Sequence, residues 1–220
     1  MSNTKKDEIR EEVYRWALDL YKEGHEYESI ILLLSTWNFA YFRFILTSFN
    51  LKNFKRDLAN LEKEDFVFFN KKSFKDIRLD DKKTVERIMR IYNTISNSGI
   101  KQVGATKVMH LLKPDVFVMW DNGIIKHYSK TYKNDKIIGK IDKTAEGYIN
   151  FMRLMQNLYM DGKFHSLDTK FTIPRAIDLY NLKWQSGNNK KPNKVKCPKC
   201  GKQNPSRGNY CPKCGTKLQK

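Results

Sequence analysis

The chain has 220 residues, of which 40% are hydrophobic and 13% aromatic, so it can form a core and is not disordered throughout. Its 42 Lys and Arg outnumber 24 Asp and Glu, and the net charge of +18 favours a polyanionic partner such as nucleic acid. The N-terminus lacks the build of a secretion signal, and the most apolar stretch, Ile30–Leu46, has 17 residues including Asn38 and Arg43. A membrane helix needs roughly 20 mainly apolar residues, so we expect a cytoplasmic protein without a membrane span.

Apolar residues recur at helical spacing through residues 1–185, which predicts an all-α domain. Gly24, Gly99 and Gly162 each follow one of these stripes and act as stop signals. The run Phe66–Phe69 is compatible with a short strand, although no partner strand is apparent. The predicted helices cover, in chain order, residues 9–20, 29–49, 85–95, 108–112 and 148–159, with a last helix starting at Pro174.

The C-terminal tail differs from the rest of the chain in composition. Residues 186–220 contain ten basic residues and no acidic one, so they carry +10 of the total charge. Residues 186–194 are polar, contain Gly and Pro and have no apolar side chain, as is typical of a linker. We therefore predict a helical domain over residues 1–185, a linker over 186–194 and a small second domain over 195–220.

All four cysteines lie in this tail, as two Cys-x2-Cys pairs separated by ten residues: Cys197, Cys200, Cys211 and Cys214. Two such pairs place four thiolates within tetrahedral reach, and a set of four sulfurs suits a structural Zn²⁺ ion with a closed coordination sphere. The pattern is similar to the zinc-ribbon family. Two disulfides or an iron–sulfur site are the alternatives. The surrounding lysines favour nucleic-acid contact for this ribbon, with protein docking or simple stabilisation as the other readings.

Residues 99–128 form the most informative window of the helical part. A helix is predicted to end at Gly99, and a turn over Ile100–Gly104 leads into the next helix. Such a turn presents backbone N–H groups at a helix N-terminus, with Lys101 and Lys107 beside them. The sequence therefore predicts an anion site suited to one DNA phosphate, which positions the protein without reading bases.

Asp121 is the second candidate functional residue of this window. It follows the apolar run Val116–Trp120, and a carboxylate in such a place is costly unless it caps a helix or belongs to a site. The sequence after it, Asn-Gly-Ile-Ile-Lys, could begin a helix. The cap and a catalytic role are compatible, so both readings stay open.

Residues 99–128 resemble the helix-hairpin-helix (HhH-GPD) superfamily of DNA glycosylases, which includes endonuclease III and the alkyladenine glycosylases. The segment Ile100–Gly104 takes the place of that family's Leu-Pro-Gly-Val-Gly hairpin, the apolar run ending in Asp121 matches its catalytic aspartate, and Lys126 falls where several members keep a basic residue. Thr106 stands where bifunctional members carry their Schiff-base lysine, and Lys107 is one residue later. The family's iron–sulfur cysteine motif has no counterpart in the ribbon spacing.

The resemblance implies a DNA partner and a base-flipping mechanism. Asp121 would stabilise the oxocarbenium-like sugar or activate a water, and Lys107 is the candidate nucleophile for a Schiff base. Four aromatic residues are candidates for stacking on a flipped base, namely Trp37, Phe39, Tyr41 and Trp120. The residues expected to contact nucleic acid are Lys101, Gln102, Val103, Gly104, Thr106 and Lys126.

Three functional hypotheses follow from the sequence. The first is a base-excision DNA glycosylase, with or without AP-lyase activity, whose zinc ribbon adds affinity for DNA. The second is a non-catalytic nucleic-acid-binding protein that uses the same hairpin and ribbon. The third is an accessory factor of nucleotide or RNA processing that is recruited through the ribbon. A carboxylate close to a DNA backbone repels it by roughly 1 kcal/mol, and the presence of Asp121 therefore favours the enzyme.

Overall fold

The computed structural model describes residues 3–37, 42, 49–133, 135–164, 167–188, 194–201, 203–205, 214 and 216. The chain divides into two compact units, residues 1–180 and 181–220. We call residues 1–180 the helical domain and describe each unit by itself. The described part of this domain is helical, which confirms the all-α prediction, and the tail carries a small two-stranded sheet.

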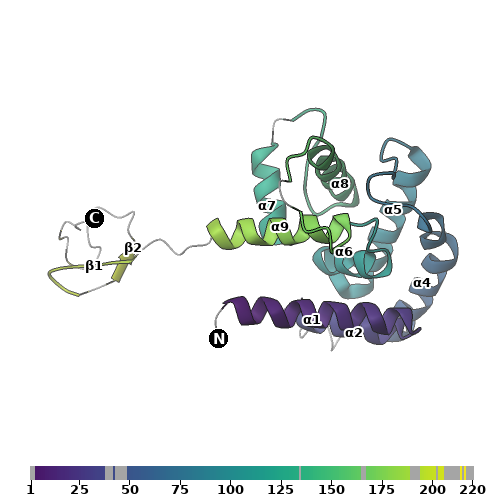
Figure 1. Ribbon diagram of the computed structural model, residues 1–220, viewed down its shortest axis with the longest axis horizontal. Helices are drawn as coiled ribbons and strands as arrows, with labels where there is room; N and C mark the ends of the chain where they lie inside the picture. Colours follow the sequence, from purple (N-terminus) through teal and green to yellow (C-terminus); the bar gives the residue numbers. More distant parts are fainter. Residues whose placement is uncertain are drawn as a thin grey trace. The chain divides into compact units, whose positions relative to one another are not determined.

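The described residues up to 188 form the following elements, of which the α-helices are labelled in Figure 1, and the last helix continues past residue 180. The α-helices are α1 (Asn3–Lys22), α2 (Glu26–Trp37), α4 (Leu51–Glu64), α5 (Lys82–Ile95), α6 (Lys101–Leu112), α7 (Asn122–Thr131), α8 (Ala145–Met160) and α9 (Ile173–Asn188). A 3-10 turn covers Phe66–Phe69 and a π turn covers Ser96–Ile100. Helix α9 continues to Asn188, three residues into the segment predicted as a linker.

Two elements differ from the sequence-based expectations. The run Phe66–Phe69 forms one 3-10 turn instead of a strand, because Phe66 and Phe69 both turn into the core while Val67 stays half exposed. The long apolar helix predicted over residues 29–49 ends as α2 at Trp37, and most of the remainder lies outside the described residues.

Short polar side chains determine where four helices begin. Asn50, Asp81, Asp121 and Thr144 each precede a helix and accept a hydrogen bond from the backbone N–H three residues later, at 2.8 to 3.0 Å. Each of these N-caps satisfies one of the four backbone donors that a helix start leaves free, and loss of such a cap costs about 1 kcal/mol.

Helix α6 lies at the centre of the domain and contacts α1, α2 and α5 (Figure 1). Every residue from Gly104 to Leu112 is buried. His110, in the middle of this stretch, has Nδ1 2.7 Å from the Phe117 carbonyl oxygen and Nε2 2.7 Å from the Tyr14 hydroxyl. Because a carbonyl oxygen can only accept, Nδ1 donates and Nε2 accepts from Tyr14. Burial lowers the pKa of His110 to about 3.

A second part of the core is an aromatic cluster between α5 and α8. Trp120 is 1% exposed and its ring lies 5.1 Å from Tyr148 and 5.4 Å from Phe151, while Tyr92 stacks on Tyr148 at 5.2 Å. The Tyr148 hydroxyl donates to the Val118 carbonyl at 2.8 Å. Trp120 is therefore a core side chain and not a stacking platform for a flipped base, because the apolar run before Asp121 is the wall of the core.

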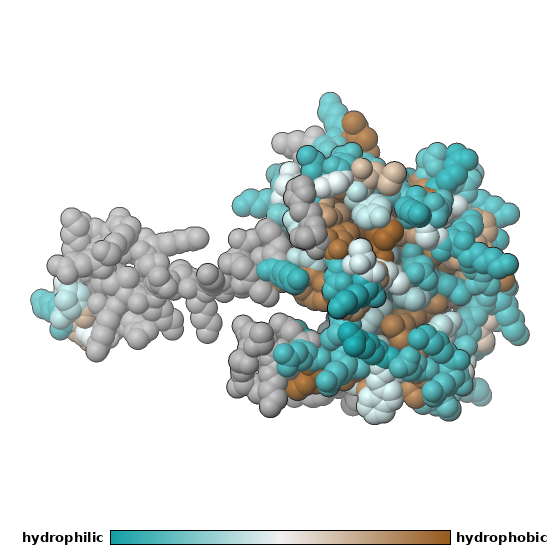
Figure 2. Space-filling model, in the orientation of Figure 1, coloured by the Kyte–Doolittle hydropathy of each residue, from teal (hydrophilic) through white to brown (hydrophobic). Residues whose placement is uncertain are grey.

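The face in Figure 2 shows hydrophilic residues over most of the periphery of the helical domain. Among the described helices, none combines the length and the apolar character that crossing a membrane requires. In the tail, β1 (Lys194–Lys196) and β2 (Gln203–Pro205) pair antiparallel, with Val195 opposite Asn204.

Candidate functional site

The turn between α5 and α6 is tighter than the sequence suggests. Gly99 has φ 101° and Lys101 has φ 62°, so the direction of the chain changes at these two residues. Gln102, Val103 and Gly104, expected in the turn, lie instead in the first part of α6. A lysine in the left-handed region carries strain of about 1–3 kcal/mol, which the surrounding structure must offset.

Among the described residues, no side chain caps the N-terminus of α6. Ile100, the residue before the helix, has no side chain that can cap it, and Lys101 is exposed at this end. The indole Nε1 of Trp120 donates to the Gln102 carbonyl at 3.4 Å and so attaches the turn to the core. The positive end of the α6 dipole and the Lys101 side chain thus belong to the same helix end, an arrangement that favours an oxyanion.

The structure divides the expected nucleic-acid contacts into accessible and inaccessible residues. Lys101 and Lys126 are exposed, and Gln102 and Val103 are partly exposed. Gly104 is buried, and so is Thr106, whose hydroxyl donates to the Val103 carbonyl at 3.1 Å. Thr106 therefore supports the helix start from inside, and a direct DNA contact from it would require the core to open.

Lys107 is 8% exposed, and its Nζ donates to the Trp37 carbonyl oxygen at 2.6 Å, at the C-terminal end of α2. A cation there complements the negative end of the α2 dipole. Burial lowers the pKa of Lys107 to about 8, although the negative charges of Asp178 and Asp121 act against that shift. The amine is therefore much closer to neutral than an ordinary surface lysine at physiological pH.

A buried ionic cluster surrounds this lysine. Arg175 of α9 is 2% exposed and pairs with Asp178 and with Glu11 of α1. Its guanidinium also lies 4.8 Å from the ring centroid of Tyr14 and 4.5 Å from that of Trp37. Burial raises the pKa of Asp178 to about 6, against the attraction of Arg175. Charges this deep remain tolerable because each has a partner of opposite sign.

Asp121 caps α7, since its Oδ1 accepts from the Ile124 N–H at 2.8 Å. It is partly exposed, and its charge is close enough to raise the pKa values of both Lys107 and Asp178. The structure therefore brings the two catalytic candidates, Asp121 and Lys107, into one electrostatic neighbourhood. The sequence analysis missed Asp178 as a third member, although a charged residue within the apolar run Ala176–Leu179 was a signal for it.

The candidates for base stacking are not available in the way the sequence suggested. Trp37 stacks on Tyr14 at 5.3 Å, and its Nε1 donates to the Arg10 carbonyl at 3.1 Å. Its ring is thus used inside the ionic cluster. Phe39 and Tyr41 lie outside the described residues.

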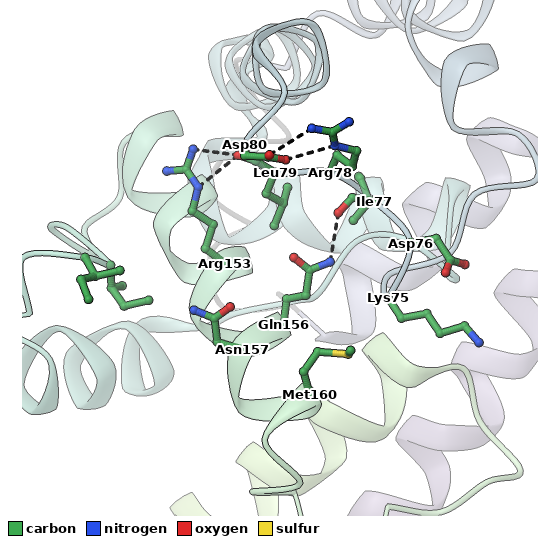
Figure 3. Close-up of a pocket in the computed structure, with 12 residues that line it drawn as sticks. Lys75, Asp76, Ile77, Arg78, Leu79, Asp80, Arg153, Gln156, Asn157 and Met160 are labelled. Carbon is green, nitrogen blue, oxygen red and sulfur yellow. Dashed lines mark hydrogen bonds and ion pairs between the residues drawn. The ribbon is translucent and has the colours of Figure 1, made fainter.

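A hollow of about 390 Å³ lies where the loop of residues 75–80 meets α8 (Figure 3). Arg153 donates from Nε and Nη2 to the Leu79 carbonyl at 3.1 and 2.8 Å. Gln156 donates to the Ile77 carbonyl at 3.0 Å. These side chains point from α8 to the loop and hold its backbone, so we read the hollow as a structural joint.

The tail contains the candidate metal centre. The Sγ atoms of Cys197, Cys200 and Cys214 all lie within 4.8 Å of one another, and Cys211 is outside the described residues. Gly201 has φ 70°, and its N–H donates to the Cys197 carbonyl at 2.9 Å, which closes the turn after the first cysteine pair. Three converging thiols with a fourth at the right spacing fit a tetrahedral, structural Zn²⁺ ion.

Comparison with known families shows that residues 196–218 match the zinc-ribbon domain. No curated protein and no solved structure matched the chain. The tail therefore carries a zinc ribbon, a module that suggests binding to nucleic acid or protein. The comparisons give no support for the glycosylase resemblance of the helical domain, which rests on residues 99–128 alone.

We expect Lys107 to make the stability of the helical domain depend on pH above neutrality. Between pH 8 and 10.5 the unfolded chain still holds a proton that the folded chain has released, so the free energy of unfolding rises with pH. The full effect is about 3 kcal/mol at 1.36 kcal/mol per pKa unit. Urea unfolding at pH 7.5 and 9.5 should show this rise in the wild type and not in Lys107→Met. An equal rise in both proteins would contradict it.

Zinc should be retained by the ribbon and not by the helical domain. The full chain should purify with one Zn²⁺ per chain, and Cys197→Ser should lose most of it because three thiolates leave the coordination sphere open. Metal analysis by mass spectrometry measures the content. The far-ultraviolet circular dichroism of the helices should stay the same after chelation, and loss of helix on chelation would contradict a purely local role.

Proposed function

We propose that the chain is a DNA-binding protein whose helical domain holds a backbone phosphate at the turn between α5 and α6. The observation that carries the proposal is the exposed, left-handed Lys101 at the uncapped N-terminus of the buried helix α6. The net charge of +18 and the zinc ribbon support the same partner.

In this function the turn between α5 and α6 forms the phosphate-binding site, which we call the phosphate seat. The phosphate accepts from backbone N–H groups in the first turn of α6 and from the Lys101 amine. Lys126, exposed on α7, adds a second cation. The ten basic residues of segment 186–220 add affinity that depends on salt and not on base sequence.

Lys101→Glu should weaken binding of a short DNA duplex by about tenfold or more, because it replaces a phosphate contact by repulsion. Fluorescence anisotropy at several salt concentrations measures the affinity. Lys71→Glu is the matched control, since Lys71 is also exposed and has φ 61° but does not stand at the start of an α-helix. Equal losses in both variants would show a general charge effect and overturn the phosphate seat.

A second candidate function is excision of a base from DNA, and the lowered pKa of Lys107 beside Asp121 favours it. A neutral Nζ can attack C1′ of the sugar. The N–C1′ bond forms, the glycosidic bond breaks, and the base leaves with the bonding electrons and takes up the proton that the attacking amine releases. Opening of the sugar ring then gives a Schiff base. The Asp121 carboxylate stabilises the positive charge that develops on the sugar. Lys107 must first leave the Trp37 carbonyl.

Duplexes with single lesions test this second function: 8-oxoguanine, uracil, alkyladenine and thymine glycol. Strand cleavage is scored with and without alkali, and borohydride is used to trap a covalent adduct. We expect cleavage of one lesion in the wild type, loss of it in Asp121→Asn, and retention in Asp81→Asn, which alters the corresponding cap of α5. Trapping should be lost in Lys107→Met. Duplex binding without cleavage of any lesion would leave Asp121 as a helix cap.

A further inference from the structure

A second basic site lies between α7 and the loop that leads into α8. It is a hollow of about 520 Å³, the size of pockets that hold small ligands. Four lysines line it, and all four are exposed: Lys130, Lys133, Lys140 and Lys143. Asp142 is the one acidic residue in the lining. The hollow therefore carries a formal charge of +3 from its lining, which suits a multiply charged anion.

The charge of Asp142 is already neutralised inside the lining. Its Oδ2 pairs with Lys140 Nζ at 2.8 Å, and its Oδ1 accepts from the Thr144 N–H at 3.0 Å and from the Thr144 hydroxyl. Both carboxylate oxygens are thus engaged by the loop itself. Lys130, Lys133 and Lys143 remain to face an incoming anion.

The wall that carries Lys140 and Lys143 is held in place by close packing. Gly147 lies in the first turns of α8, and a Cβ at this position would meet the backbone of Asp142. The Tyr92 hydroxyl also donates to the Lys143 carbonyl at 2.8 Å. The lysines on this side therefore stand on a fixed backbone, and binding an anion does not require the loop to be ordered first.

The floor of the hollow is apolar and aromatic. Ile125 and Ile141 are 7% and 4% exposed, and the partly exposed ring of Tyr132 stacks on Tyr128 with centroids 6.2 Å apart. An inorganic ion makes no favourable contact with apolar and aromatic side chains. The sugar and base of a nucleotide do, because every base has a face that can stack on an aromatic ring.

We propose that this hollow binds a nucleotide through its phosphate monoester, either as a free nucleotide or as the phosphorylated end of a nucleic-acid strand. The three lysines meet the phosphate, and Tyr132 with the two isoleucines takes the sugar and base. Lys126 and Lys130 lie one turn apart on α7, so the hollow continues the basic line that begins near Asp121. The strand-end form of the proposal rests on the proposed DNA binding, whereas the free-nucleotide form is independent of it.

Isothermal titration with adenosine 5′-monophosphate tests the site in the full chain. The wild type should bind this nucleotide more tightly than adenosine or inorganic phosphate. Lys133→Gln/Lys143→Gln, which removes one charge from each wall, should weaken binding by about tenfold or more. Lys52→Gln/Lys163→Gln removes the same charge from exposed lysines of α4 and of the segment after α8, and should bind like the wild type. Thermal unfolding confirms that both variants are folded.

A pair of single-stranded hexamers, with a 5′-phosphate and with a 5′-hydroxyl, distinguishes the two sources of the ligand. Preference for the phosphorylated hexamer that disappears in Lys133→Gln/Lys143→Gln identifies a strand end. Equal binding of both hexamers, with the free nucleotide bound more tightly, identifies a free nucleotide. The proposal is overturned if the wild type does not bind the nucleotide, or if the two lysine variants behave alike.

Duplex binding by the same variants separates this site from the phosphate seat at Lys101. Nucleotide binding that persists in Lys101→Glu, while duplex binding falls, supports two separate sites. If the wild type binds the nucleotide but no duplex, the proposed function is overturned and the nucleotide site is supported.

Discussion

The burial of α6 from Gly104 to Leu112 is the constraint on which the rest of the helical domain depends. A buried helical stretch must give every polar side chain on it a partner inside the protein. Thr106 finds the Val103 carbonyl, Lys107 finds the Trp37 carbonyl, and His110 finds Tyr14 and Phe117. These hydrogen bonds attach α1, α2 and the apolar run before Asp121 to α6. The N-terminus of α6 is the turn to which we assign phosphate binding.

Local patterns predicted the helices whose apolar residues recur every three to four positions among charged ones, such as α5 with Ile88 and Ile95. Helix α4 was missed, although its buried residues Phe54, Leu58 and Leu61 recur at helical spacing. Where the local pattern fitted both a helix and a strand, strand pairing and burial against distant parts of the chain determined the secondary structure. Phe66–Phe69 is such a case, since four aromatic and branched residues favour a strand only where another strand is available.

The sequence predicts those parts of the candidate sites whose residues are neighbours in the chain. It does not predict the parts whose residues come from distant segments. The cysteine spacing identifies the ribbon by itself, and the cap role of Asp121 follows from the residues next to it. The coupling of Lys107 to Asp178 joins residues far apart in the chain, so no window of sequence contains it. The basic hollow is likewise not visible in the sequence, because the isoleucines beneath the lysines meet only when α7 and the loop before α8 come together.

The imidazole of His110 also sets a limit to the conditions under which α1 stays docked. A doubly protonated ring would be a buried cation near the Arg175 guanidinium, and both burial and that positive charge disfavour it. An unfolded chain takes up that second proton near pH 6.5, whereas the folded chain resists it until about pH 3. Acidification from about pH 6.5 towards pH 3 therefore lowers the free energy of unfolding of the domain, in which the Tyr14–His110 hydrogen bond joins the first helix to the central one.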